Sequence, residues 1–297
     1  MGVHEHAERE TYKSEKDLRY ALVLTSSIFI IELIGGVISN SLALLSDAGH
    51  VFSDAFALAL SWAALRLAAR PPSAARTFGY HRTEVFAALI NGVVLLFVVL
   101  LIFREAYGRI LSPQQVKTTQ MLGIAMVGLL ANLWVVFRLR EHARKDLNVK
   151  SALLHATGDA VSSVGVILGA VLIMLTGYYF IDAAISIFIA LVILAGSLRL
   201  VRDSLHILLE GTPMHINLDE VVKTISGVKG VIDVHDLHVW SICSHITAAS
   251  AHVVVEECEI SEVDRISGQV NDRMKGLDIT HTTLQLESEG KVCEVKH

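Results

Sequence analysis

The chain has 297 residues, of which 53% are hydrophobic and 19% are charged, and its formal net charge is −5. It is more apolar and less charged than a typical soluble domain, so a wholly soluble globular protein is excluded and no nucleic-acid partner is expected. From about Gly211 onward the charges are evenly spread and the apolar runs shorten to strand length. This change predicts a membrane domain followed by a soluble domain.

Six apolar segments are each long enough to cross a hydrocarbon core of ~30 Å, which takes about 20 helical residues. They cover Tyr20–Ser39, Leu42–Leu65, Val85–Tyr107, Gln120–Leu139, Ala152–Gly177 and Phe180–Leu200. Very short links join the first to the second and the fifth to the sixth, which predicts two tight antiparallel hairpins. We therefore predict an all-α six-helix transmembrane domain at 20–205, in contact with the lipid bilayer, after a cytosolic N-terminal tail at 1–19.

Lysine and arginine residues gather on one side of these predicted spans. The N-terminal segment, the second-to-third link, the fourth-to-fifth link and the end of the sixth span are rich in them, whereas the opposite side carries only Arg109 and Lys117. Because positively charged loops stay in the cytoplasm, both termini are predicted to be cytoplasmic. The polar N-terminal segment does not resemble a cleavable signal peptide. A multi-pass protein of the bacterial cytoplasmic (inner) membrane fits this orientation, with an organelle membrane as the alternative.

The segment 206–297 predicts a soluble α+β domain. Its helical and strand periodicities follow one another in the order α-β-β-α-β. The predicted elements are Leu218–Ile225, Val231–Ile242, Ile246–Val255, Glu259–Lys275 and Ile279–Leu286. This order is typical of a ferredoxin-like sandwich. The three cysteines all lie in this segment and form no Cys-x-x-Cys pair, which indicates a reducing cytosolic location rather than a disulfide framework.

A His-x-x-x-Asp pair occurs twice inside apolar spans, as His50 and Asp54 in the second and as His155 and Asp159 in the fifth. Residues four apart lie on one face of a helix. An ionisable side chain at the bilayer centre costs at least ~2.5–3.5 kcal/mol, so such residues usually mark an ion pathway. Two imidazoles and two carboxylates make a complete tetrahedral ligand set for Zn²⁺. The alternatives are helix capping, polar helix packing, or a metal-free proton relay.

Three further acidic residues lie in or beside the apolar spans. Asp47 is on nearly the same face as His50, where it either orients that histidine or only belongs to the outer part of the helix. Glu32, deep in the first span, has a stronger claim on function than Asp182, near the start of the sixth, because intramembrane acids seldom serve packing.

Three histidines, His235, His252 and His281, stand on three separate predicted strands. If they converge across one sheet or with a partner chain, they form a cytosolic metal site, whereas an isolated strand histidine such as His238 is usually structural. Glu287 lies six residues beyond His281, roughly 20 Å away along an extended strand, so the two meet at one metal only if the chain bends. The remaining candidate donors lie on terminal segments that are expected to be solvated: His4, His6, Cys293 and His297.

Four motifs together resemble the cation diffusion facilitator family, in its zinc-exporting branch. They are Glu32-Leu-Ile-Gly-Gly, Ser39-Asn-Ser-Leu-Ala-Leu-Leu-Ser-Asp-Ala-Gly-His50, Phe78-Gly-Tyr-His-Arg-Thr-Glu84 and Val234-His-Asp-Leu-His-Val-Trp240. The resemblance implies a homodimer that exchanges cytosolic Zn²⁺ for protons by alternating access, with the transport site at the four membrane residues above. It also implies that 206–297 is a metal-binding dimerisation domain that holds further Zn²⁺, in a structural or regulatory role, with His235, His252 and His281 at the matching positions.

Two features depart from the family pattern. The link between the fourth and fifth spans, Glu141–Lys150, carries a single histidine, His142, so no loop metal reservoir is expected. The link between the second and third spans has Arg76 and Tyr80 where some relatives place metal ligands, so no site is expected there and His81 is the only donor left.

Zinc binding needs deprotonated ligands, and histidine ordinarily titrates near pH 6.5. Zinc exit and proton entry are therefore predicted to be two occupancies of one site, which makes the chain a transporter and not an enzyme. One rival is an intramembrane zinc hydrolase, which needs an open coordination position and typically His-Glu-x-x-His, a motif that the sequence lacks. The others are a membrane-bound metal-sensing scaffold and a passive channel.

Overall fold

The computed structural model describes residues 22–68, 70–140, 147–256 and 260–289. The chain divides into two compact units. One contains the residues up to Leu65 together with Ala87–Val201, and the other contains Arg66–Phe86 together with the residues from Arg202 onward. The loop between the second and third membrane helices thus groups with the C-terminal part of the chain.

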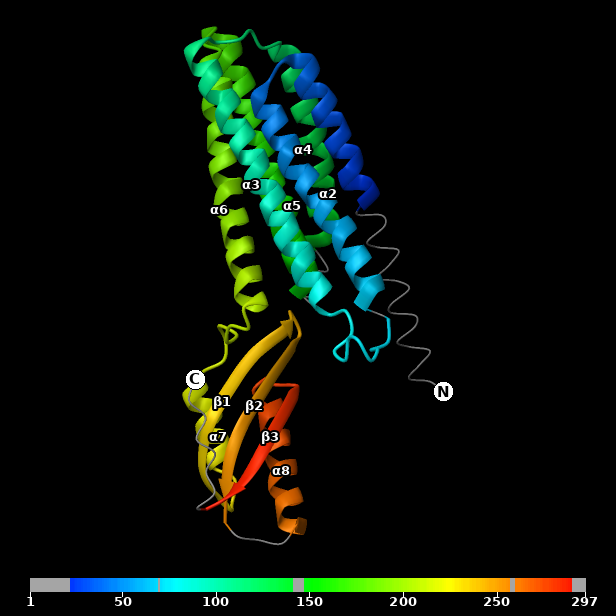
Figure 1. Cartoon of the computed structure of the whole chain (residues 1–297). Coiled ribbons are helices and arrows are strands. Elements are labelled where there is room, and N and C mark those ends of the chain that lie inside the picture. Colours follow the sequence, from blue (N-terminus) through cyan, green and yellow to red (C-terminus); the bar gives the residue numbers. More distant parts are fainter. Residues whose placement is uncertain (1–21, 69, 141–146, 257–259, 290–297) are drawn as a thin grey trace, which may run out of the picture. The chain divides into compact units, whose positions relative to one another are not determined.

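Six helices in the described residues are long and apolar enough to cross a membrane. They are the first helix (Leu22–Ser39), α2 (Leu42–Ala68), α3 (Arg82–Leu111), α4 (Thr118–Arg140), α5 (Leu147–Thr176) and α6 (Phe180–Leu208), and they run alongside one another in Figure 1. The predicted six spans are confirmed. α3, α5 and α6 extend beyond the predicted spans because charged residues at the membrane edge continue a helix well, whereas hydropathy marks only its apolar part.

Apolar side chains of all sizes fill the inside of the bundle, and many large apolar side chains also lie on its outside. Leu44, Met121 and Val166 are fully buried, whereas Phe97 and Leu175 are 60% and 78% exposed. A Cβ atom added at Gly169 would lie 2.2 Å from the terminal methyl carbon Cδ1 of Ile185, so the glycine lets this side chain of α6 lie directly against α5. An outward-facing apolar surface of this kind is what a lipid-embedded bundle presents.

Asp182 anchors the start of α2 rather than lining an ion path. Its carboxylate accepts hydrogen bonds from Ser41 Oγ (2.6 Å) and from the backbone N–H groups of Leu42 (2.6 Å) and Ala43 (3.2 Å). Arg109 Nη1 lies 3.5 Å from Asp182 Oδ2. The buried carboxylate thus satisfies the free N–H groups of a helix N-terminus and ties α6 to α2 and α3. The structure thereby gives Asp182 a structural role.

The C-terminal unit contains α7 (Leu218–Ser226), β1 (Val231–Cys243), β2 (Ile246–Val255), α8 (Ile260–Lys275) and β3 (His281–Ser288), which confirms the predicted α-β-β-α-β order. The strands form one sheet in the order β1-β2-β3, in which β1 pairs antiparallel with β2 and β2 pairs parallel with β3. α8 makes the crossover that a parallel pair requires, and α7 and α8 lie against the same side of the sheet (Figure 1).

The core of this unit lies between that helical layer and the sheet. Ile225 of α7, Val253 of β2 and Ile266 of α8 are buried in one apolar cluster. Ile279, predicted as the first residue of the last strand, is fully buried just before β3 begins. Its apolar, β-branched side chain is typical of a strand, but the residue lies in the core at the end of the crossover.

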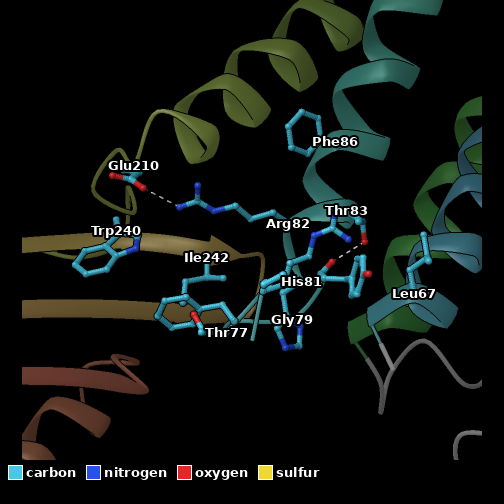
Figure 2. Close-up of a pocket in the computed structure, with 14 residues that line it drawn as sticks. Leu67, Thr77, Gly79, His81, Arg82, Thr83, Phe86, Glu210, Trp240 and Ile242 are labelled. Atoms are coloured by element: carbon cyan, nitrogen blue, oxygen red, sulfur yellow. Dashed lines mark hydrogen bonds and ion pairs between the residues drawn. The ribbon is translucent and has the colours of Figure 1, made fainter. Parts of the chain in front are cut away.

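The segment Arg66–Phe86, which contains the end of α2, the following loop and the first turn of α3, has its own contacts. The Arg76 guanidinium lies 4.4 Å from the centre of the Tyr80 ring, so the two residues that replace expected metal ligands bind each other. Figure 2 shows Arg82 reaching Glu210, with a distance of 3.0 Å between Arg82 Nη2 and Glu210 Oε1. A cavity of about 690 Å³ lies beside them and is lined by residues of this segment together with Glu210, Trp240 and Ile242. Figure 2 shows these lining residues.

Candidate metal centres

Two membrane helices bring four potential metal ligands to one point. His50 and Asp54 come from α2, and His155 and Asp159 come from α5. Across the helices, His50 Nε2 lies 3.4 Å from Asp159 Oδ1 and His155 Nε2 lies 3.3 Å from Asp54 Oδ2. Within each helix the corresponding distances are 3.9 Å and 3.7 Å. One ligand atom from each of the four residues lies within 4.8 Å of all the others.

These spacings match a zinc coordination sphere. With bonds of about 2.0–2.2 Å to nitrogen and oxygen, the edges of a tetrahedron around Zn²⁺ are about 3.3–3.6 Å long. Two of the four measured distances fall in that range and the others exceed it by at most a few tenths of an ångström. Asp159 Oδ1 is buried and makes no hydrogen bond within the described part of the chain. A buried carboxylate oxygen without a hydrogen bond is costly unless an ion takes that place.

The quartet is partly accessible. The side chains of His50, Asp54 and Asp159 are 32%, 21% and 16% exposed, and that of His155 is 51% exposed. A cavity of about 430 Å³ reaches His50 and is lined mostly by apolar residues of α5 and α6. The four groups therefore lie inside the bundle and yet within reach of a hydrated ion.

Two more carboxylates lie near the quartet without joining it. Asp47 is buried and accepts a hydrogen bond of 2.5 Å from Ser162 Oγ, which links α2 to α5 beside the site. Glu32 is 1% exposed. Its Oε2 makes no hydrogen bond to another described residue, and the same holds for Ser163 Oγ.

A second group of ligands forms on the sheet of the C-terminal unit. His235 of β1 and His252 of β2 are direct cross-strand partners, and their ring centres are 5.3 Å apart. Glu287 of β3 lies between them, with Oε2 3.4 Å from His235 Nε2 and Oε1 3.0 Å from His252 Nδ1. Both ring nitrogens of His235 are buried and lack hydrogen bonds to other described residues. A nitrogen–nitrogen–oxygen group of this kind suits Zn²⁺.

A bulge in β1 directs side chains toward this group. The register shifts between His235 and His238, and Asp236 has φ of 50°, in the left-handed region that few residues other than glycine adopt. Asp236 Oδ2 lies 3.6 Å from His252 Nε2, and Oδ1 lies 3.0 Å from His238 Nε2. Strict alternation along a strand would put Asp236 on the opposite face from His235. The bulge brings it next to the group.

His281 is not brought to His235 and His252 by the fold of one chain. It begins β3 opposite Ala248, and its ring centre lies 5.4 Å from that of Phe78. The strand does not bend Glu287 back to His281, and Glu287 instead joins the other two histidines. The parallel register of β2 and β3 places Glu287 there, a pairing that the sequence did not reveal. The other candidate donors fall outside the described residues: His4, His6, His142, Cys293 and His297.

Comparisons with known proteins cover nearly the whole chain. The family model for the cation efflux transmembrane domain matches residues 18–209, and that for the cation efflux protein cytoplasmic domain matches residues 213–289. The chain is 40% identical over 279 residues to a cadmium, cobalt and zinc/H(+)-K(+) antiporter of Bacillus subtilis, covering 93% of this chain and 90% of the relative. It is 40% identical to the metal cation efflux system protein CzcD of Cupriavidus metallidurans (92% and 87% covered). It is 34% identical to the zinc transporter ZitB of Escherichia coli (96% and 92% covered).

Proposed function

Because the chain belongs to the cation efflux family, also called the cation diffusion facilitators, we propose that it exports Zn²⁺ from the cytosol in exchange for protons by alternating access. The resemblance drawn from the four motifs is confirmed, and so is the fold of six membrane helices plus an α+β domain. The observation that carries the proposal is the spacing of the quartet His50, Asp54, His155 and Asp159, whose ligand atoms lie within 4.8 Å of one another.

Charge balance explains how one site can serve both ions. Two carboxylates with two neutral imidazoles carry a charge of −2, which one Zn²⁺ cancels. Two protons cancel it equally well when both imidazoles become cationic beside the carboxylates. Because an uncompensated charge inside the membrane is costly, the loaded and the protonated site are both stable, and the empty, unprotonated site is not. The helix bundle then moves with either cargo, and zinc leaves where protons enter.

Contacts around the quartet favour a site that moves as a unit. The cross-helix distances of 3.3 Å and 3.4 Å mean that α2 and α5 each supply half of the ligands. The hydrogen bond from Ser162 to Asp47 joins the same two helices. Rocking of this pair against the rest of the bundle would expose the site alternately without separating its ligands.

The positively charged loops support a protein with both termini in the cytoplasm, and the bacterial relatives support the bacterial inner membrane. The match to the cytoplasmic domain model supports a homodimer built through the C-terminal part. We keep the division into a tail at 1–19, a transmembrane domain at 20–205 and a cytosolic metal-binding dimerisation domain at 206–297.

In that cytosolic domain, His235, His252 and Glu287 would hold Zn²⁺ in a structural or regulatory role. His235 Nε2 and His252 Nδ1 face the two oxygens of one carboxylate, so the three groups can converge on one ion. His281 remains a proposed ligand for which the second copy of the chain would have to supply the remaining donors.

The decisive experiment measures zinc uptake into vesicles that hold purified protein, with and without an imposed proton gradient. The antiporter predicts that uptake accelerates when protons can leave the vesicle in exchange. A passive channel predicts flux that ignores the gradient, and a metal-sensing scaffold predicts no flux at all. X-ray absorption of the zinc-loaded membrane site distinguishes a hydrolase, because four protein ligands leave no place for the water that a hydrolase needs.

A further inference from the structure

A third group of metal-binding side chains lies at the turn between β1 and β2. Cys243 ends β1 and pairs with Ile246, the first residue of β2, so Ser244 and His245 alone form the turn. Glu84, in the first turn of α3, lies against this hairpin. One ligand atom each from Glu84, Cys243 and His245 lies within 4.8 Å of the other two. All three residues belong to the same compact unit.

The carboxylate of Glu84 is held in a defined orientation. Ser244 Oγ donates a hydrogen bond of 2.8 Å to Glu84 Oε1. The other oxygen, Oε2, lies 3.4 Å from His245 Nε2, which again equals the edge of a zinc tetrahedron, about 3.3–3.6 Å. A hydrogen bond to the second oxygen is the usual support of a metal-binding carboxylate.

Each residue alone has an ordinary explanation. A buried free cysteine packs like a small apolar side chain, and an exposed histidine–glutamate pair contributes little to stability. These separate explanations do not account for the meeting of the three side chains at one point. Cys243 is a free thiol that is 2% exposed, whereas the side chain of His245 is 70% exposed. Packing therefore accounts for the cysteine but not for the histidine and carboxylate beside it.

We propose that Glu84, Cys243 and His245 form a third metal site that takes a thiophilic divalent cation of the zinc, cadmium and cobalt class. The site offers one sulfur, one nitrogen and one oxygen. This ligand set binds soft to borderline ions in preference to Mg²⁺ or Ca²⁺. Binding releases the thiol proton to solvent, since the thiolate is the ligand. The fourth position is open to water or to another small ligand.

The side chain of His245 is 70% exposed, so this part of the group is open to an ion from solvent. Thr83 and Ile242, the residues directly before Glu84 and Cys243, both line the cavity of about 690 Å³ that Figure 2 shows. An ion in this site would tie the first turn of α3 to the β1–β2 turn. This site contains sulfur and the other two do not, which makes it spectroscopically separable from them.

The test uses full-length protein in detergent with Cys258 and Cys293 replaced by serine, so that Cys243 is the single thiol. Cobalt(II) is titrated in, and the thiolate-to-cobalt charge-transfer absorption is followed. We expect the thiolate–cobalt absorption to appear and to saturate at one cobalt ion per chain. We also expect His245→Ala and Glu84→Gln each to weaken the cobalt affinity of that band by at least about tenfold.

His215→Ala is the matched control, because this histidine is exposed in the same unit and outside the group, and it should leave the affinity unchanged. His245 is itself exposed, so its alanine variant should fold. Absence of the band, or unchanged cobalt affinity in His245→Ala, overturns the proposal. Asp159→Asn in the same background should keep the band whatever it does to transport, which separates this site from the proposed transport function.

Discussion

Removing one negative charge from the quartet gives the sharpest test of the transport site. Asp159→Asn preserves the size of the side chain and removes only the charge. With Zn²⁺ held by two neutral imidazoles and two carboxylates, the wild-type site has no net charge. The variant would hold the same ion with a net charge of +1 inside the bundle, since Asp54 would be the single carboxylate left.

The expected magnitude follows from this charge count. An uncompensated charge within the bilayer costs at least ~2.5–3.5 kcal/mol, and each 1.4 kcal/mol corresponds to a factor of ten in affinity. Zinc affinity of the membrane site should therefore fall by at least about 60-fold. The variant should also exchange fewer protons per ion, because one of the two charges that protons neutralise has been removed.

The assay combines zinc binding by competition with a chromogenic chelator and zinc uptake into vesicles under a proton gradient. Asp203→Asn is the matched control, since that carboxylate is 47% exposed, pairs with Arg202 at 3.0 Å and does not belong to the quartet. It should bind and transport zinc as the wild type does. If Asp159→Asn bound zinc within a factor of a few of the wild type and transported it at a near-normal rate, the charge argument and the placement of the site would both be wrong.

Three further predictions follow from other contacts. Glu287→Gln should weaken zinc binding to the cytosolic site by at least about tenfold. Glu289→Gln, at an exposed residue just after β3, should leave this affinity unchanged. Equal effects of the two variants in a chelator competition would contradict the proposed ligand role of Glu287. Asp182→Ala should lower the free energy of unfolding by about 3 kcal/mol or more, because it leaves the buried donors at the start of α2 without an acceptor. Arg109 would keep its contacts with Glu105 and Asn40. A loss below about 1 kcal/mol in detergent unfolding would argue against the anchor. The hydrogen bond from Arg265 lowers the pKa of Glu262 below its ordinary value of 4.5. The small stabilisation from this ion pair is therefore present above pH 4.5 and is lost as the pH falls through the lowered pKa. In Arg265→Ala, the pKa of Glu262 measured by NMR titration should return toward its ordinary value.

The sequence by itself was sufficient to predict the membrane helices and to place the four residues of the proposed transport site on two helix faces. Six apolar stretches of bilayer length define six helices, and a spacing of four places His50 with Asp54 and His155 with Asp159 on single helix faces. Only local periodicity is needed for these conclusions. The convergence of the two pairs was an inference from the cost of isolated charges in lipid, and the structure brings them within 4.8 Å.

Tertiary structure decided what depends on strand register, bulges and chain crossings. The parallel pairing of β2 with β3 places Glu287, and not His281, beside His252. A bulge, in which Asp236 has a left-handed backbone conformation, turns this residue to the face opposite to the one that strict alternation predicts. The meeting of Glu84 with Cys243 and His245 joins positions about 160 residues apart. Such contacts are set by packing between distant segments, and periodicity along the chain carries no information about them.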